Sequence, residues 1–332
     1  MPDATPSFHR APGRRRLRLA GLGDLPGLLG VLLLLILVFG LASRNFWTWR
    51  TLQSVVNQVP DLVVVAVGMT AVVIAGGIDL SVGSVLALSG SVLGIAMTHW
   101  GWPLGVSAAL ALAVGAGCGL VNGSICAAWR VPSFIVTLGM LEIARGLAYR
   151  ITDSQTQYIG TPVEWLARPV GGLGISPAFL ACVAIVLAGQ ILLTRTVWGR
   201  HLIAVGSNEP AARLSGLATR RIRLVTFVIS GTLAAAGAVF QVARLSTADP
   251  NGGIGLELAA IAAVVIGGTS LMGGEGSVVR SFLGVLVVAV LQAGLAQVGA
   301  SEPTKRVLTG SVIVLAVIAD LHRRDRTGGG SR

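Results

Sequence analysis

Residues 79–130 read DLSVGSVLALSGSVLGIAMTHWGWPLGVSAALALAVGAGCGLVNGSICAAWR, and 50 residues without a formal charge lie between the charged ends. A helix needs about 20 mostly apolar residues to cross the ~30 Å hydrocarbon core of a bilayer, so this stretch is long enough for two spans. Backbone polar groups in lipid must be bonded within the segment, which favours helices. The runs of Leu, Ala and Gly also lack the alternation typical of a membrane β-barrel.

The rest of the chain follows the same pattern. Of its 332 residues, 53% are hydrophobic and 12% are charged, against roughly 25% charged in an ordinary soluble domain. The composition therefore predicts an all-α polytopic membrane protein. We expect about ten spans, of which the third, eighth and tenth are short enough to be tilted, broken or partly re-entrant. They are Leu25–Ala42, Val55–Ile74, Val82–Met97, Pro103–Ala127, Ser133–Tyr149, Pro177–Leu193, Arg223–Gln241, Leu256–Gly267, Ser281–Val298 and Val307–Asp320.

The predicted organisation is one membrane domain, residues 25–321, between the short tails 1–24 and 322–332. If the N-terminus is cytoplasmic, 17 of the 25 Lys and Arg residues fall on inside segments, seven on outside loops and one, Arg145, within a span. Cytoplasmic loops of membrane proteins carry the excess of basic residues, so both termini are expected inside. The net charge of +11 is then scattered over short loops beside membrane lipid, which argues against a nucleic-acid-binding domain.

One inside loop is long and basic. Residues 194–223 read TRTVWGRHLIAVGSNEPAARLSGLATRRIR. Within it, Asn208, Glu209 and Pro210 supply the signals of a helix start, and Gly216 supplies a stop about two turns later. A short capped helix on the charged side of a membrane protein indicates contact with a soluble partner.

Residues for catalysis are sparse. The four histidines lie in tails, loops or span ends, and the three cysteines lie in spans, where a thiol usually serves as a small buried hydrophobe. No spacing resembles a zinc site. A phosphate-binding P-loop needs a lysine, and Lys305, the one lysine, falls on the outer side. We therefore expect no enzyme, no metal and no cofactor bound by this chain.

Four blocks of sequence, in order, resemble the signatures of the inner-membrane permeases of ribose-type ABC sugar importers. They are AGGIDLSVGSVLALSG at Ala75–Gly90, PSFIVTLG at Pro132–Gly139, AVGSNEPAARLSGL at Ala204–Leu217 and ELAAIAAVVIGGTSLMGGEG at Glu257–Gly276. The resemblance, which runs from about Leu25 to Asp320, implies a type II-like architecture in the bacterial inner membrane. It also implies a second permease copy or paralogue, a cytoplasmic ATPase that uses ATP and Mg, and a periplasmic sugar-binding protein.

The third block resembles the ATPase-docking segment of that family, and the Lys and Arg count places it in the cytoplasm independently. The residues expected to dock are Asn208, Glu209, Ala211, Ala212, Arg213 and Gly216. Glu209 and Arg213 stand four apart, so they are expected either to pair within the helix or to meet opposite charges on the partner.

The first block supplies a candidate structural or gating motif, composed of Gly76, Gly77, Asp79, Ser81 and Gly83. We expect Asp79 at the inner membrane face, either as an N-cap of the third span or in gating or substrate contact. Gly83 offers a small face for close helix packing. The segments 76–85 and 267–278 also echo each other, a weak sign of the internal repeats common in transporters.

Polar side chains within the spans are candidates for the translocation path or for bonds between helices. They are Asn57, Gln58, Asn122, Gln190, Gln241 and Gln292, together with the charged Glu142 and Arg145. Glu142 and Arg145 stand three apart and are expected to neutralise each other as a local ion pair. Arg145 fits the family pattern, whereas Glu142 replaces an expected apolar or small residue, a departure that bears on substrate choice if no pair forms.

Two other classes stay open. An ion-coupled secondary transporter or channel needs its own relay of charged groups, and Asp61, Asp79 and Glu142 are few and dispersed. A membrane-embedded enzyme needs a nucleophile or metal set that the sequence does not show. The best-supported function is the permease subunit of an ATP-driven importer of a monosaccharide or related polyol.

Overall fold

The computed structural model describes residues 25–129, 131–172 and 174–328 as a helical protein with one two-residue ladder. The predicted tail 1–24 and the end 329–332 lie outside the described residues. The helices are α1 (Leu25–Ala42), α2 (Trp49–Gln58), α3 (Pro60–Ile74), α4 (Val82–Thr98), α5 (Leu104–Trp129), α6 (Ser133–Thr152), α7 (Thr161–Glu164), α8 (Pro177–Arg195), α9 (Val197–Ser207), α10 (Glu209–Leu214), α11 (Thr219–Leu245), α12 (Leu256–Ile266), α13 (Val278–Gln297) and α14 (Glu302–Gly328).

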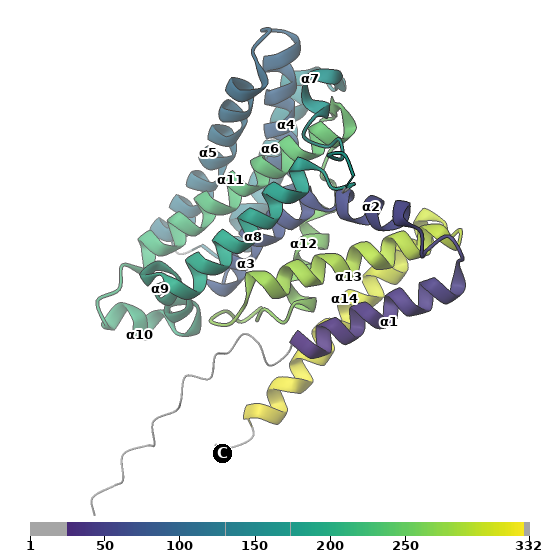
Figure 1. The fold of residues 1–332 in the computed structure, drawn as a ribbon. Helices are drawn as coiled ribbons and strands as arrows, with labels where there is room; N and C mark the ends of the chain where they lie inside the picture. The colour runs from purple at the N-terminus through teal and green to yellow at the C-terminus, as the bar shows by residue number, and fades with distance from the viewer. Residues whose placement is uncertain (1–24, 130, 173, 329–332) are drawn as a thin grey trace, which may run out of the picture.

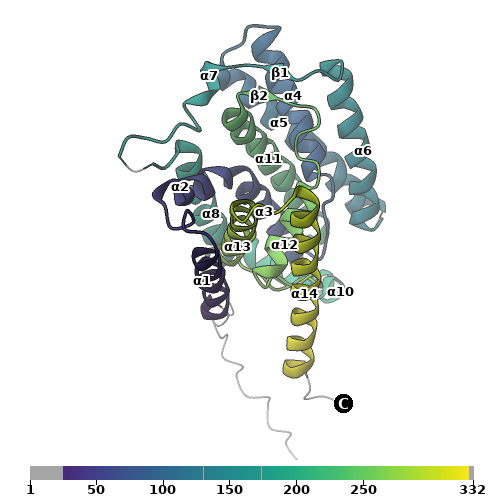
Figure 2. The same ribbon diagram turned by 90° about the vertical axis from the view of Figure 1, so that its right-hand side faces the viewer.

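The ladder pairs β1 (Gln157–Tyr158) with β2 (Thr247–Ala248) in antiparallel register, Gln157 opposite Ala248. It packs on α4, where Gly94 lies against Gln157 and Ala248. The ladder lies at one end of the molecule, and α10 lies at the other, as do the start of α1 and the end of α14 (Figure 1; Figure 2). We call these the ladder end and the α10 end.

The expected helical membrane fold is confirmed, with changes in the individual spans. Among the described residues, α1, α5, α8, α11 and α13 are each long and apolar enough to cross a membrane, and α2 with α3 passes as one bent span. α4 and α12 are shorter apolar helices, as expected for the third and eighth spans. α6 and α14, which cover the predicted fifth and tenth spans, are not among the candidate spans of the described residues. α14 has 27 residues, and the predicted boundary of the C-terminal tail falls inside it. The count of ten spans stays a prediction.

The second predicted span, Val55–Ile74, is wrong as a single helix. α2 and α3 meet at an angle of 45°, with Val59 between them and Pro60 as the first residue of α3. Proline lacks a backbone N–H and its ring clashes with the carbonyl four residues earlier, so it is favoured in the first turn of a helix and kinks or breaks a helix that it interrupts. The bend therefore follows from Pro60.

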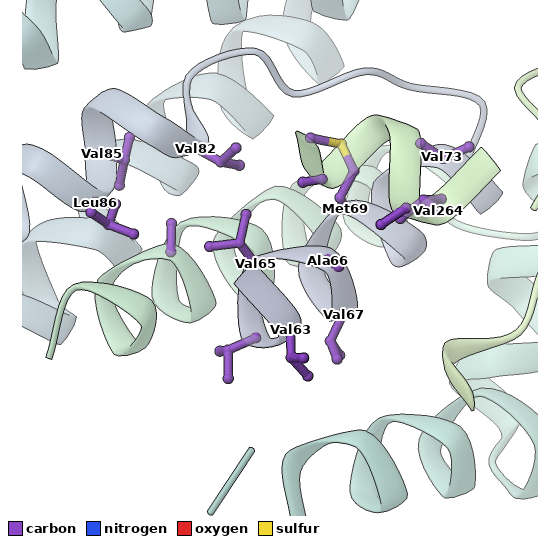
Figure 3. Close-up of a cluster of buried hydrophobic side chains, with 14 of the residues drawn as sticks. Val63, Val65, Ala66, Val67, Met69, Val73, Val82, Val85, Leu86 and Val264 are labelled. Carbon is purple, nitrogen blue, oxygen red and sulfur yellow. The ribbon is translucent and has the colours of Figure 1, made fainter. Parts of the chain in front are cut away.

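α3 is the centre of the bundle. Thirteen of its fifteen residues are buried, and Val65 and Met69 point towards side chains of α4 and α12 (Figure 3). A helix that is hydrophobic on every side is one that neighbouring helices surround. Because lipid tails are as apolar as valine, these contacts stabilise the bundle by close packing rather than by removing surface from water.

α5 and α11 cross closely through glycines. A Cβ atom added at Gly115 would meet the Gly231 carbonyl, one at Gly119 would meet the backbone of Phe227, and one at Gly123 would meet the backbone of Leu224. The four-residue spacing puts all three glycines on one face of α5. Small residues at this spacing let membrane helices bring their backbones together.

We expect Gly119→Ala to destabilise the protein, because its new methyl group meets backbone atoms that cannot rotate away. Overpacking of this kind costs about 1–3 kcal/mol, which will lower the apparent melting temperature of the purified permease in detergent. Gly117→Ala is the matched control, since a Cβ there meets nothing within 4 Å. Equal melting temperatures for the two variants would contradict the glycine crossing.

Candidate functional site

Two glycine turns end α3 and α12 in the same way. After α3, the N–H groups of Gly76 and Gly77 donate to the carbonyls of Val73 and Val72; after α12, those of Gly268 and Thr269 donate to Val265 and Val264. Gly76 has a φ of 76° and Gly268 one of 74°, the left-handed conformation that glycine adopts without strain at helix ends. The two similar sequence segments, 76–85 and 267–278, therefore begin with the same backbone geometry.

The segment that follows the first turn, residues 76–81, is unwound and is held by α6. Ser133 Oγ accepts the N–H of Ile78 at 2.9 Å, and Thr137 Oγ1 accepts the N–H of Leu80 at 3.1 Å. Thr137 also donates towards the carbonyl of Ile78 at 3.3 Å. An unwound backbone is tolerated within a membrane protein when neighbouring side chains satisfy it, so the first two sequence blocks form one unit.

Asp79 lies at the centre of a buried polar network and is itself only 1% exposed. Its Oδ1 accepts from the Ser81 N–H at 3.0 Å and the Ser81 hydroxyl at 2.6 Å, and its Oδ2 accepts from the Ser230 hydroxyl of α11 at 2.8 Å. Asn122 of α5 donates to Ser81 Oγ at 3.0 Å. Three segments that are distant in sequence, residues 79–81, α5 and α11, thus meet in one network around the Asp79 carboxylate.

The expectation that Asp79 is the N-cap residue of the third span is wrong, and its position at the inner membrane face stays a prediction. Ser81 is the N-cap residue of α4, and Asp79 is buried among helices instead of lying at a surface. It still accepts one free backbone N–H next to the helix start, as an aspartate before a helix does. Gly83, in the first turn of α4, lies against the Gly253 carbonyl and the Glu257 carboxylate, so its small size serves close packing.

The short helix predicted in the basic loop is confirmed as α10. Asn208 is its N-cap, and its side-chain oxygen accepts the Ala211 N–H at 3.0 Å. Gly216 follows the helix with a φ of 83°, the left-handed stop that its position indicates. The remainder of the segment is not a loop, because α9 fills residues 197–207 and α11 begins at Thr219.

Glu209 ties α10 to α11. Its carboxylate pairs with Arg213 at 3.2 Å within the helix and with Arg223 of α11 at 2.6 Å. The predicted pair with Arg213 is therefore present, and the contact with Arg223 was not predicted. Side-chain exposures between 24% and 45% leave both pairs partly screened, and exposed pairs contribute about 0–1 kcal/mol each. They orient α10 more than they stabilise it.

Two exposed apolar residues lie at the α10 end and were missed by sequence reasoning. Leu214, the last residue of α10, is 91% exposed, and Met272, in the second glycine turn, is 79% exposed. Leu214 ends a capped helix whose Ala212 is buried, so only three-dimensional packing shows which apolar residue faces out. Exposed apolar side chains rimmed by charge are typical of protein-contact sites.

α9 and α10 rest directly on both glycine turns. Gly206, at the end of α9, lies against the Ile74 carbonyl at the end of α3, and the Gly274 N–H donates to that same carbonyl at 2.8 Å. Gly274 also lies against Ser207, which directly precedes Asn208, the cap of α10. These backbone contacts leave no room for a side chain, so α10 and the two turns form one tightly packed unit.

The polar candidates for the translocation path fall in different places. Asn57 bonds the backbone of Gly174 and Ser176 and fixes the segment before α8. Asn122 is buried in the Asp79 network, whereas Gln292 of α13 and Glu142 of α6 are exposed. Of the other polar span residues, Gln58 bonds Ser54, Gln190 holds Ser277 and Val279, and Gln241 lies against Gly252.

The predicted ion pair between Glu142 and Arg145 is wrong. The Arg145 Nη1 atom donates to the carbonyls of Pro250 at 2.6 Å and Gly252 at 2.9 Å, and within the described residues no ion pair joins the two side chains. A guanidinium is a planar fork of donors, so it turns towards two converging carbonyls of the β2–α12 segment rather than towards a carboxylate on its own helix.

Ser230→Ala tests the Asp79 network, because it removes the hydroxyl that donates to Oδ2 of a buried carboxylate. Hydrogen bonds to charged groups contribute about 1.5–3 kcal/mol, so we expect a clear loss of thermal stability in detergent. Thr226→Val, also buried on α11, is the control, since the Thr226 hydroxyl donates within its own helix to Ile222. A loss for Thr226→Val as large as that for Ser230→Ala would contradict the network.

A second test separates Glu142 from Arg145. Arg145→Gln loses two bonds to the β2–α12 segment, so we expect lower membrane abundance, while Glu142→Gln breaks no observed bond. Glu142 and Arg145 share no hydrogen bond or ion pair, so the loss caused by Arg145→Gln should persist in the double variant. Immunoblots of membranes give the abundances. If the double variant is more abundant in membranes than Arg145→Gln alone, the two side chains interact, and the result would support the ion pair after all.

Comparison of the sequence with known proteins identifies the family of this chain. Residues 51–317 match the family model described as branched-chain amino acid transport system / permease component. No solved structure matches the chain.

Three curated relatives show the range of similar proteins. The chain is 39% identical to the ribose import permease of Escherichia coli (strain K12), over 93% of this chain and 97% of that protein. It is 36% identical to an L-arabinose ABC transporter permease of Azospirillum brasilense, over 97% and 95% of the two chains. It is 31% identical to a fructose import permease of Rhizobium meliloti, over 87% and 83%.

Proposed function

The chain belongs to the branched-chain amino acid transport system / permease component family, and we propose that it is the translocating subunit of an ATP-driven importer of a monosaccharide or related polyol. Its relatives named for ribose, arabinose and fructose import support this substrate class. In the proposed arrangement a periplasmic binding protein delivers the sugar at the ladder end. A cytoplasmic ATPase, paired with two permease subunits, binds at the α10 end and uses ATP and Mg.

The observation that carries the proposal is the exposed tip of α10. Leu214 is 91% exposed on a helix that is capped at both ends and seated on backbone. Asn208, Glu209, Ala211, Arg213 and Gly216 shape the surface of this helix, and Ala212 anchors it, being 6% exposed. A rigid helix with an outward leucine is suited to a groove on a soluble partner, in the way that amphipathic helices dock by apolar anchors.

Movement of α10 has a direct route into the membrane domain. Because Gly206 and Gly274 lie against the end of α3, a push on α10 is a push on both glycine turns. Arg223 carries the same displacement to α11. Beside the first turn, a cavity of about 260 Å³ is lined by Gly76, Gly77 and Arg223, among others, and this cavity gives the turn space to move. Rigid-body shifts of packed helices are a common means of switching.

We expect Leu214→Ser to separate the permease from its ATPase. The side chain packs on little of its own protein, so membrane abundance should be unchanged, while the amount of ATPase that copurifies falls at least tenfold. The permease, expressed in its native host, would be purified through a tag on this chain. Leu245→Ser, at the ladder end and 48% exposed, is the control and should copurify the ATPase normally.

Uptake of radiolabelled ribose, arabinose or fructose by the same cells tests the energy source. Uptake should stop when ATP is depleted with the proton gradient intact, and it should fall with Leu214→Ser but not with Leu245→Ser. Uptake that continues without ATP would identify an ion-coupled transporter or channel and overturn the proposal.

A further inference from the structure

An apolar cavity lies between α8 and α11, towards the α10 end of the molecule. Its volume is about 360 Å³, within the range of roughly 300–1,000 Å³ that is typical of small-molecule sites. Val67 and Ala71 of α3, the buried centre of the bundle, form its floor. α8 and α11 both have one end beside α9 (Figure 1), and Trp198 and Leu202 of α9 close the cavity there. All its lining residues are apolar or glycine, so it favours an apolar occupant.

The cavity opens on the outer face of α8. Ala188 and Leu192 line it and are also exposed at the surface. The surface around them is apolar as well, since Leu187 and Ile191 of α8 are 54% and 58% exposed. α8 is long and apolar enough to cross a membrane, and the exposed apolar face of such a helix meets lipid tails or another helix. The opening is therefore bordered by surface that suits an acyl chain.

A basic side chain stands at one end of this opening. Arg195, the last residue of α8, follows Ala188 by seven residues and Leu192 by three, which keeps all three on one face of the helix. Arg195 is exposed, and it forms no ion pair with another described residue. Its guanidinium offers five N–H donors in a fork that matches phosphate. An anionic group at this end of the cavity would find a charged partner.

Trp198 adds a second donor at the same end. It lines the cavity, and its indole Nε1 atom is buried with no hydrogen-bond acceptor among the described residues. A buried tryptophan N–H usually has an acceptor, so a ligand that brings an oxygen atom to this end would satisfy it. Tryptophan is also enriched where membrane proteins meet lipid headgroups. The donors thus gather at one end of a cavity that is otherwise apolar.

We propose that the cavity binds one acyl chain of an anionic phospholipid, with the lipid phosphate at Arg195 and a glycerol ester carbonyl towards the Trp198 N–H. An apolar length with donors and positive charge at one end is complementary to an amphiphile that has an acidic headgroup. Basic pockets between membrane helices bind the headgroups of such lipids. The bound lipid would fill the gap between α8 and α11 and hold the α8–α9 turn against α3, a role that is separate from carrying sugar.

Thermal unfolding of the purified full-length permease tests the site. The protein is washed free of lipid in detergent and melted with increasing dioleoyl phosphatidylglycerol or dioleoyl phosphatidylcholine, which share their acyl chains and differ in headgroup charge. We expect phosphatidylglycerol to raise the apparent melting temperature at lower concentration than phosphatidylcholine does. Arg195→Gln should raise the half-saturating concentration of phosphatidylglycerol about fivefold, the effect of one basic side chain beside anionic headgroups, and should leave that of phosphatidylcholine unchanged.

Arg200→Gln is the matched control for the charge. Arg200 is exposed on α9 but stands two residues after Trp198, a spacing that turns it away from the cavity. Its replacement should leave the preference for phosphatidylglycerol intact. Equal effects of Arg195→Gln and Arg200→Gln would show attraction of the lipid to basic residues in general and would overturn the site.

Occupation of the cavity is tested by filling it. Ala188→Phe places a ring in the opening and should abolish stabilisation by phosphatidylglycerol, whereas Leu187→Phe, on the adjacent exposed position, should not. If Ala188→Phe does not fold, the comparison of Arg195→Gln with Arg200→Gln decides. No stabilisation of the unchanged protein by phosphatidylglycerol would overturn the inference and would point to a protein subunit as the cover of this face. These measurements need no sugar, ATP or ATPase, so their failure is distinct from a failure of the proposed import function.

Discussion

Unwound backbone that is buried inside a membrane protein must find partners for its N–H groups, and residues 76–81 meet this constraint with side chains from α6 and from the segment itself. Ser133 and Thr137 of α6 take two of the N–H groups, and Asp79 takes that of Ser81. Because water is absent from the hydrocarbon core, each missing partner there costs several kcal/mol. The placement of α6 against α4, and the entry of α4 into the bundle, depend on these bonds.

α11 contacts other helices near its start, at its middle and near its end. Arg223 near its start pairs with Glu209 of α10, Ser230 bonds Asp79, and Arg244 near its end pairs with Asp61 of α3 at 2.8 Å. The glycine crossing with α5 fixes the same helix laterally. A helix restrained at three depths moves as one body, so a displacement at one end reaches the Asp79 network and the far end together.

The features that could be predicted from the sequence depend on neighbouring residues. Asn208 and Gly216 mark the ends of α10 because caps are set by a single turn of chain, and uncharged runs mark spans because length and composition suffice. Pro60 predicts the break between α2 and α3, but the continuous apolar stretch around it favoured a single span. The partners of Arg145 lie more than 100 residues away, and spacing along α6 offered only Glu142. Tertiary contacts decided the outcome, as they do for the link between Ser230 and Asp79.

The N-terminal ends of α4 and α12 lie close together, which brings the positive ends of two helix dipoles into one place. The first turn of α4 lies against the segment that opens α12, and the Glu257 carboxylate lies beside Gly83 while accepting the Gly255 N–H. Helix N-termini carry partial positive charge, so Glu257, together with Asp79, offsets the dipoles of both short helices where they converge. That compensation is built into the protein itself, so these helix ends need no counter-charge from a solute. The neutral sugar of the proposed function carries no charge, and the transmembrane voltage would then do little work on its passage.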